Sequence, residues 1–163
     1  MDLQKLKTEL EKIEFYHIND LKKLVDDFNK IIIIGNGGSN SIASHISQDY
    51  TKVLGKKAMS FSDPSRLTCY INDYGRDEAY KKYIEHFADK TTLVILISSS
   101  GNSMNIINTA KYLEENKITY IALSGFDKDN KLNTMNAKLK YWVDSKDYGI
   151  VENIHQILLH SIL

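Results

Sequence analysis

The sequence predicts a single α/β domain: a doubly wound sheet of five parallel strands in flavodoxin-like order, with helices on both faces. Short apolar runs alternate with segments whose apolar residues recur every three or four positions, which is the pattern of strands alternating with helices. Two of these runs end in turns rich in serine, glycine and asparagine that open helices. Because this alternation needs crossover connections, we expect the strands to be parallel. No repeat or linker in the 163 residues indicates a second domain.

The N-terminal segment, residues 3–28, is expected to form one long amphipathic helix. Its polar face is dense in lysine, glutamate and aspartate, which is typical of a solvated face, although a partner subunit could also cover it. Three- and four-residue spacing places the following side chains on its other face: Leu3, Leu6, Leu10, Ile13, His17, Leu21, Leu24, Val25 and Phe28. This face is wide for a chain with one small sheet. We therefore interpret residues 1–29 as an oligomerisation helix within one domain that spans residues 1–163.

The rest of the chain continues the alternation of strands and helices. Asp63 can cap a helix that has Pro64 at its first position, because the aspartate side chain accepts free N–H groups and proline has none to satisfy. The sequence Asn72-Asp73-Tyr74-Gly75 has the composition of a loop. The expected order is strand 31–34, helix 40–53, strand 58–61, helix from 64, loop 72–75, helix 77–88, strand 92–97, helix 105–116, strand 118–123, strand 139–143 and helix from 150 to the end.

The overall composition argues against several classes of function. The 21 basic and 21 acidic residues cancel, which disfavours binding to nucleic acid or to an anionic membrane surface. The apolar runs are only strand-length and the N-terminus lacks an apolar signal core, so neither a membrane span nor a secretory peptide is expected. Cys69 is the single cysteine and permits no internal disulfide. The expected location is therefore the cytoplasm.

The two polar turns predict a phosphate site. Residues 35–40 read GNGGSN and residues 98–103 read SSSGNS, each directly after an apolar strand. Such turns gather backbone N–H groups, hydroxyl donors and the positive end of a helix dipole, which suit a phosphate monoester. The first turn lacks the lysine of a P-loop and the G-x-G-x-x-G spacing of a dinucleotide site, so a small phosphorylated ligand fits better. Tight turns also use these residues without a ligand, but two such turns at one edge of a sheet favour a site.

Two helices carry side chains that could act on such a ligand. His45 and Asp49 are four residues apart after the first turn, and Glu152, Gln156 and His160 repeat this spacing near the end of the chain. Residues four apart share a helix face, so the two faces together could supply nitrogen and oxygen ligands to a divalent metal. Each histidine alone could equally be a packing or surface residue, and the first pair could be an exposed ion pair.

Together these motifs resemble the sugar isomerase (SIS) domain and, within it, the phosphoheptose isomerases. The resemblance rests on GNGGS at 35–39, NDYG at 72–75, SSSGNS at 98–103 and the histidines of the last helix, and it runs from about residue 31 to the end. It implies the SIS fold and a homo-oligomer, with a tetramer favoured over a dimer. It also implies the isomerisation of sedoheptulose 7-phosphate to D-glycero-D-manno-heptose 7-phosphate, a step toward the heptose of bacterial lipopolysaccharide or capsule.

The resemblance also implies roles for individual residues. The phosphate-binding positions are Ser39, Ser98, Ser99, Ser100 and Ser103. The other substrate-binding positions are Asn36, Gly37, Gly38, Asp73 and Glu152. The positions of the family's metal ligands, for which Zn²⁺ is the expected ion, are His45, Asp49, Glu152 and His160. The catalytic positions are Asp49 and His160.

Two of these positions, and a third near the start of the last helix, depart from the family's pattern. Asp49 stands where the family has glutamate and is one methylene shorter, Glu152 stands where it has glutamine, and Gly149 stands where it has an acid. A shorter base can fall out of reach, and a misplacement on the order of 1 Å can lower a rate by about 100-fold. A carboxylate in place of a neutral amide suits a divalent metal but changes its Lewis acidity.

The expected function is an aldose–ketose isomerase that acts on a sugar phosphate. The serine turns would anchor the phosphate, Asp49 would take a proton from one carbon, His160 would return or relay a proton, and a metal would polarise the carbonyl. One alternative is a non-catalytic SIS protein that binds a protein partner such as a replication initiator. The other is a sugar-phosphate sensor, which is disfavoured because residues 1–29 contain no helix-turn-helix. The retained histidines and acid favour the enzyme, whereas the three departures keep the partner-binding alternative open.

Overall fold

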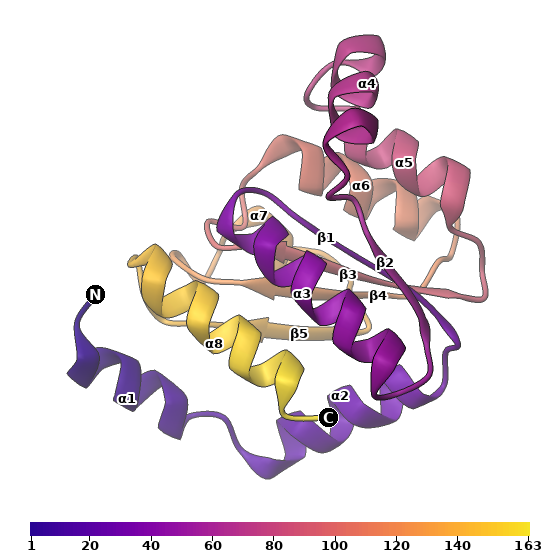
Figure 1. Ribbon diagram of the computed structural model, residues 1–163. Coiled ribbons are helices and arrows are strands. Elements are labelled where there is room, and N and C mark those ends of the chain that lie inside the picture. Colours follow the sequence, from indigo (N-terminus) through magenta and orange to yellow (C-terminus); the bar gives the residue numbers. More distant parts are fainter.

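A five-stranded parallel sheet forms the centre of the computed structural model, which describes residues 1–163 (Figure 1). Its strands lie in the order β2-β1-β3-β4-β5, so the predicted flavodoxin-like order is confirmed. The strands are β1 (Lys30–Gly35), β2 (Lys57–Ser60), β3 (Thr92–Ser98), β4 (Tyr120–Ser124) and β5 (Leu139–Trp142). The helices are α1 (Leu3–Glu11), α2 (Phe15–Asp26), α3 (Gly38–Lys52), α4 (Pro64–Tyr74), α5 (Ala79–Phe87), α6 (Met104–Glu115), α7 (Lys131–Thr134) and α8 (Tyr148–His160).

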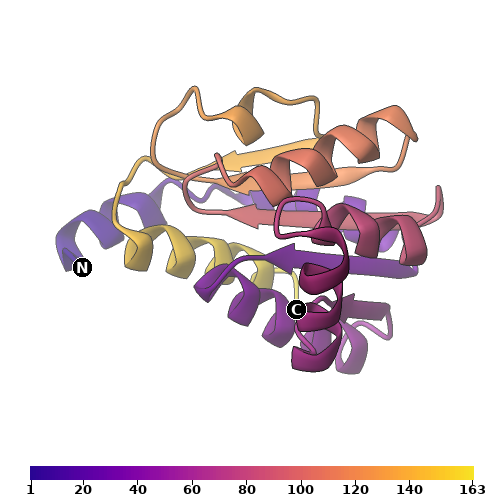
Figure 2. The ribbon, with the colours of Figure 1, turned by 90° about the horizontal axis from the view of Figure 1, so that it is seen from above.

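Helices cover both faces of the sheet (Figure 2). On one face, α2, α3 and α8 pack against Ile31 and Ile33 of β1 in one hydrophobic core. On the other face, α5 and α6 pack against Ile32 and Ile34 in a second core. The central strands β1 and β3 are almost wholly buried because helices lie on both sides of them, which explains their continuous apolar sequences.

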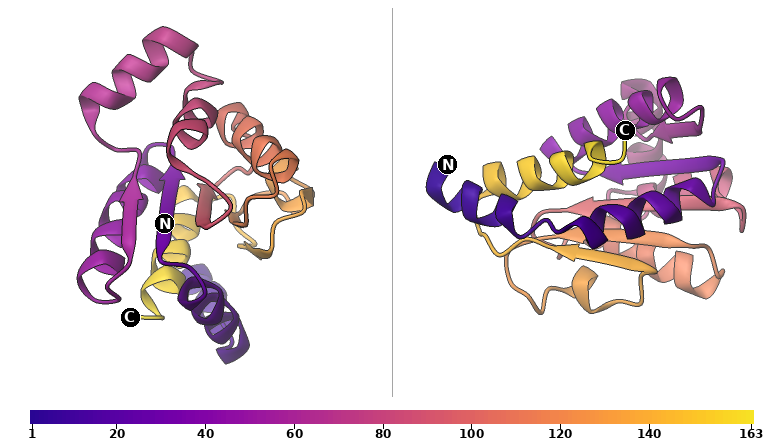
Figure 3. Two further views of the ribbon diagram at one scale, coloured as in Figure 1. Left: turned by 90° about the vertical axis from the view of Figure 1, so that its right-hand side faces the viewer. Right: turned by 90° about the horizontal axis from the view of Figure 1, so that it is seen from below.

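The N-terminal segment forms two helices, so the prediction of one helix over residues 3–28 is wrong. The break falls at residues 12–14, where Glu14 is extended and its N–H donates to Nδ1 of His17 at 3.1 Å. The break lets the two helices lie in different places: α2 packs into the core, while α1 lies against α8 (Figure 3). Periodicity did not reveal the break because the apolar spacing continues through it.

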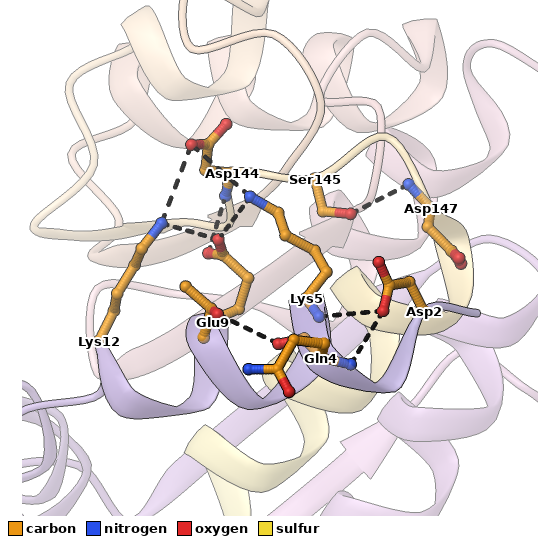
Figure 4. Close-up of polar contacts among 9 residues, drawn as sticks. Asp2, Gln4, Lys5, Glu9, Lys12, Asp144, Ser145 and Asp147 are labelled. Carbon is orange, nitrogen blue, oxygen red and sulfur yellow. Dashed lines mark hydrogen bonds and ion pairs between the residues drawn. The ribbon is translucent and has the colours of Figure 1, made fainter.

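The polar face of α1 is not simply solvated, because Glu9 is only 2% exposed. Lys5 and Lys12 donate to its Oε1 at 3.0 and 2.7 Å (Figure 4). The backbone N–H of Asp144 donates to its Oε2 at 3.3 Å. Glu9 therefore ties α1 to the loop between β5 and α8.

The loop predicted at residues 72–75 is also corrected. Asn72, Asp73 and Tyr74 form the last turn of α4, and only Gly75, at φ 78°, ends the helix. Asparagine and aspartate disfavour helices when they bond to the backbone, but here Asn72 donates to the side chain of Asp73. The short helix α7 was not predicted, whereas the other boundaries agree within three residues. None of the helices is long and apolar enough to cross a membrane.

Candidate active site

The two polar turns lie side by side at the carboxyl ends of β1 and β3. In the parallel register Gly35 pairs with Ile97, so the residues after each strand leave the sheet at the same edge. Gly37 and Gly101 have φ values of 55° and 64°, which L side chains rarely adopt. Neither Gly37, the N-cap residue of α3, nor Ser103, the N-cap residue of α6, makes a side-chain hydrogen bond to the helix that it opens. The N-terminus of α6 therefore remains available to an anion, whereas at α3 the carboxylate of Glu152 already accepts from the N–H of Ser39.

The predicted phosphate-binding serines lie in these turns and at the starts of the helices. Ser39, Ser98 and Ser99 are buried, while Ser100 and Ser103 are half-buried. The hydroxyl of Ser99 has no hydrogen-bond partner. Buried polar groups without partners are rare, and they concentrate where a ligand or an ordered water completes the bonding. The serine turns thus have the unsatisfied polar groups that an anion site requires.

Three side chains from two helices form a compact cluster. Nε2 of His45 on α3 and Nε2 of His160 on α8 lie 3.3 and 3.2 Å from Oδ2 of Asp49. One potential ligand atom from each residue lies within 4.8 Å of the other two. His45 is the most exposed of the three, so the cluster is open to solvent on one side. A carboxylate between two imidazoles can accept and pass on a proton, and it can also help to hold a divalent cation.

A buried tyrosine joins the two helices next to this cluster. The hydroxyl of Tyr50 donates to the backbone carbonyl of Leu159 at 3.0 Å. Burial raises the pKa of Tyr50, so its hydroxyl stays protonated and remains a donor. Because these residues adjoin Asp49 and His160 in the chain, this bond helps to set the approach of those two side chains. Tyr50 is not among the predicted site residues, and its only signal in the sequence is its position beside Asp49.

Glu152 lies apart from the three-residue cluster, at the N-terminus of α3. Its carboxylate packs against Gly38, where any side chain would collide with it. Burial raises the pKa of Glu152, while a hydrogen bond from the backbone N–H of Ser39 opposes that rise. The structure thus gathers three of the four predicted metal ligands, and it places the fourth where a helix dipole favours negative charge.

The two remaining predicted sugar contacts have different surroundings. Asp73 is exposed on α4, where its carboxylate accepts from Asn72 and Cys69, and no hydrogen bond joins it to either serine turn. Asn36 lies in the first turn and exchanges two hydrogen bonds with Asn105. Asn105 is not among the predicted site residues, although it follows the SSSGNS motif by only two positions.

A polar hollow opens beside the cluster. It has a volume of about 520 Å³ and is lined by Asn40, Ser41, Ser44, His45, Gln48 and Ser62. A hollow of the same volume, about 520 Å³, near Lys117 and Lys138 lies at the amino ends of β4 and β5. Because ligands of open α/β sheets bind at the carboxyl ends of strands, position rather than volume favours the hollow at His45.

Comparison with known proteins places this arrangement in a family. The sequence model of the SIS domain matches residues 4–125. The phosphoheptose isomerase of Fusobacterium nucleatum is 34% identical over 150 residues, which cover 87% of this chain and 76% of that protein. The phosphoheptose isomerase of Aliarcobacter butzleri is 32% identical over 166 residues, covering 98% and 85% of the two chains. The structure of phosphoheptose isomerase GmhA from Neisseria gonorrhoeae matches with a TM-score of 0.86 and 28% identity, covering 96% of this chain and 88% of that one.

Proposed function

The chain belongs to the SIS domain family and, within it, to the phosphoheptose isomerases, and we propose that it interconverts sedoheptulose 7-phosphate and D-glycero-D-manno-heptose 7-phosphate. The observation that carries this proposal is the 3.2 Å contact between His160 and Asp49, which brings a base and a proton relay together from two helices. The relatives that match most of the chain are phosphoheptose isomerases. The isomerase is therefore favoured over a protein that only binds a partner.

The serine turns are proposed to hold the phosphate. The unpaired hydroxyl of Ser99 and the N-terminus of α6, whose N-cap residue makes no side-chain hydrogen bond, support this role, because they offer donors and a positive dipole at one edge of the sheet. Anchoring the phosphate there would leave the other end of an extended sugar to reach toward α8. Binding energy at the phosphate would then position the reacting carbons.

Proton transfer is proposed for Asp49 and His160. Isomerisation of the ketose removes a proton from C1 and gives an enediol, and return of a proton to C2 leaves the aldehyde at C1. Oδ1 of Asp49 forms no hydrogen bond with another side chain, so it is free to take the carbon-bound proton. His160, whose imidazole contacts Asp49, is proposed to move a proton to or from the substrate oxygens. A positioned base contributes about 10²–10⁴-fold to the rate.

A divalent metal, with zinc as the proposed ion, fits the same cluster. Two imidazoles and one carboxylate with an open side are a donor set typical of catalytic zinc, and their ligand atoms lie within 4.8 Å of one another. His45, Asp49 and His160 would hold the ion, which when bound would polarise the substrate carbonyl. Calorimetry on chelator-treated protein should show one zinc bound per chain, weakened at least about tenfold by His45→Ala. His86→Ala, which alters a histidine outside the cluster, is the control, and equal zinc affinity in the two variants would contradict the site.

We further propose that the chain assembles as a homo-oligomer, a tetramer rather than a dimer. Leu3, Phe15 and Tyr16 are 70, 77 and 55% exposed, which is unusual for large apolar side chains outside an interface. The helix α4 has no buried residue, so a second copy could cover it. Light scattering at assay concentration should return a closed oligomer, and a monomer mass would contradict this. A cytoplasmic location and a role in lipopolysaccharide or capsule heptose synthesis stay predictions.

The proposed activity is tested by NMR with sedoheptulose 7-phosphate in D₂O. Conversion to the aldoheptose phosphate should place deuterium at C2, because a base that exchanges with solvent carries the proton. Ser98→Ala and Ser103→Ala should each raise KM, since a hydrogen bond to a charged group contributes about 1.5–3 kcal/mol. Folded wild-type protein that converts no ketose or aldose phosphate would contradict the isomerase and favour the partner-binding alternative.

A further inference from the structure

A reciprocal pair of hydrogen bonds joins the two polar turns. Nδ2 of Asn36 donates to Oδ1 of Asn105 at 3.0 Å, and Nδ2 of Asn105 donates to Oδ1 of Asn36 at 2.8 Å. Asn36 follows β1, whereas Asn105 lies in the first turn of α6, 69 residues further along the chain. Asn105 is only 5% exposed and Asn36 is half-buried. The pair therefore connects the buried Asn105, at the start of α6, to the partly accessible amide of Asn36 after β1.

A third hydrogen bond decides which way both amides face. A reciprocal amide pair would be equally satisfied if both side chains turned over, because each amide has a donor on one side and an acceptor on the other. The backbone N–H of Ile106 removes this symmetry, since it lies 3.0 Å from Oδ1 of Asn105 and can only donate. Asn105 must therefore present its oxygen there, and its Nδ2 must face the oxygen of Asn36.

We propose that Asn105 is a positioning residue that sets the orientation of the Asn36 amide for reading a sugar hydroxyl. This inference rests on the proposed function, in which Asn36 contacts the substrate. With one N–H and one lone pair of Asn36 used by Asn105, one of each remains. A hydroxyl group is both donor and acceptor, so it can use both groups. The Asn36–Asn105 pair is thus suited to discriminate between substrates: it favours a sugar that carries a hydroxyl group on a carbon near the phosphate over one that lacks it.

The orientation predicts that a carboxylate cannot replace Asn105. Asn105→Asp would still accept from Asn36 and from Ile106, but it would lose the donor that faces Oδ1 of Asn36. Two oxygens would then oppose each other whichever way the Asn36 amide faces, so the pair would no longer favour one orientation of Asn36. We therefore expect Asn105→Asp to impair the enzyme at least as much as Asn105→Ala, although aspartate is nearly the same size.

A double-mutant cycle separates positioning from a general structural role. Asn105→Ala should lower kcat/KM by about tenfold in the wild-type background, the size of one hydrogen bond. In the Asn36→Ala background the same change should lower it less than about twofold, because there is no amide left to orient. Asn108→Ala is the matched control: it removes contacts to Glu78 and Asp77 from the next turn of α6 and should change kcat/KM in neither background. An equal loss from Asn105→Ala in both backgrounds would overturn the proposal.

Side-chain amide NMR tests the same inference without turnover. One amide proton of Asn36 and one of Asn105 should exchange with solvent at least about tenfold more slowly than those of the exposed Asn19, since hydrogen-bonded protons exchange only on opening. Asn105→Ala should remove the protection of Asn36. Exchange as fast as in Asn19 would overturn the pair itself, whereas protected amides in a protein without isomerase activity would count against the proposed function alone.

Discussion

Glu9 and Asp49 each lie between two basic side chains, and the two clusters differ in how completely the carboxylate is paired. Both oxygens of Glu9 accept hydrogen bonds, one from two lysines and the other from the N–H of Asp144, and the side chain is almost fully buried (Figure 4). Both histidines contact the same oxygen of Asp49, Oδ2, and the Asp49 side chain is 22% exposed. Both oxygens of Glu9 therefore have hydrogen-bond partners, whereas Oδ1 of Asp49 has no side-chain partner.

This difference separates a structural contact from the one that we propose to be reactive. Burial by itself would raise the pKa of Glu9, but hydrogen bonds from Lys12 and Lys5 outweigh it, so the pKa is lowered and the group stays charged. A permanently charged, fully paired carboxylate has no capacity left to exchange a proton with a ligand. Its role is to hold α1 against the loop before α8. The cluster of His45, Asp49 and His160 keeps the free carboxylate oxygen and the access to solvent that proton transfer requires.

The largest expected effect comes from removing the reactive carboxylate. Asp49→Asn keeps the shape but cannot accept a proton, so turnover should fall by about 10²–10⁴-fold while sugar phosphate still binds. Asp49→Glu is the matched variant: it retains a carboxylate, one methylene further from the backbone, and should recover turnover relative to the amide. Assays with the two sugar phosphates measure both. Turnover by Asp49→Asn within threefold of wild type would remove Asp49 from the role of base.

The next largest effect is expected at acidic pH, where the buried His155, which has no acid partner, should lower the free energy of unfolding. Nε2 of His155 lies 3.1 Å from the carbonyl oxygen of Ser124 and therefore donates to it, and burial lowers the pKa of His155 to about 4. The unfolded chain takes up a proton below its ordinary value of about 6.5, so the stability supplied by neutral His155 is full above pH 6.5 and is lost toward pH 4. The loss should reach about 3 kcal/mol.

His155→Gln provides the comparison for this pH effect, because glutamine can still donate to Ser124 but does not titrate. Denaturant unfolding at several pH values should show the wild-type free energy of unfolding falling more steeply than that of the variant between pH 6.5 and 4. Parallel curves across this range would mean that His155 is protonated as easily in the folded protein as in the unfolded chain.

Removing the charge of the saturated carboxylate should affect stability rather than chemistry. Glu9→Gln weakens the bonds to Lys5 and Lys12 in a buried position, and we expect about 2 kcal/mol of destabilisation with kcat unchanged. Glu11→Gln is the control, because Glu11 is 66% exposed and pairs with Lys7 only at 3.9 Å. Urea denaturation and steady-state kinetics measure the two quantities. A strong fall in kcat with an unchanged free energy of unfolding would contradict a purely structural role for Glu9.

The smallest effect is expected from Lys12, although it makes the shorter of the two lysine contacts with Glu9. Its side chain is 47% exposed, and Glu9 would keep Lys5 and the Asp144 N–H. Lys12→Ala should therefore lower the free energy of unfolding by only about 0.5 kcal/mol. A loss equal to that of Glu9→Gln would show that the cluster acts as one cooperative network.

Much of the fold and part of the site follow from short-range patterns. The isoleucine run of β1 and the apolar run of β3 identify central strands, because only strands covered on both faces are continuously apolar. The four-residue spacing of His45 and Asp49 places them on one face of α3. The polar face of α1 nevertheless has the pattern of a solvated face, and nothing in that pattern indicates that Glu9 is buried against a loop more than a hundred residues away.

The sequence by itself determined the alternation of strands and helices, the two serine turns and the shared helix face of His45 and Asp49, because these depend on residue type and local spacing. Only the tertiary structure decided that His160 meets Asp49, that Glu152 turns instead to Gly38, and that Asn105 faces Asn36. The physical reason is that helical periodicity tells which residues share a face. How far two helices approach, and at which turn they touch, depends on the packing of side chains such as Tyr50 between them.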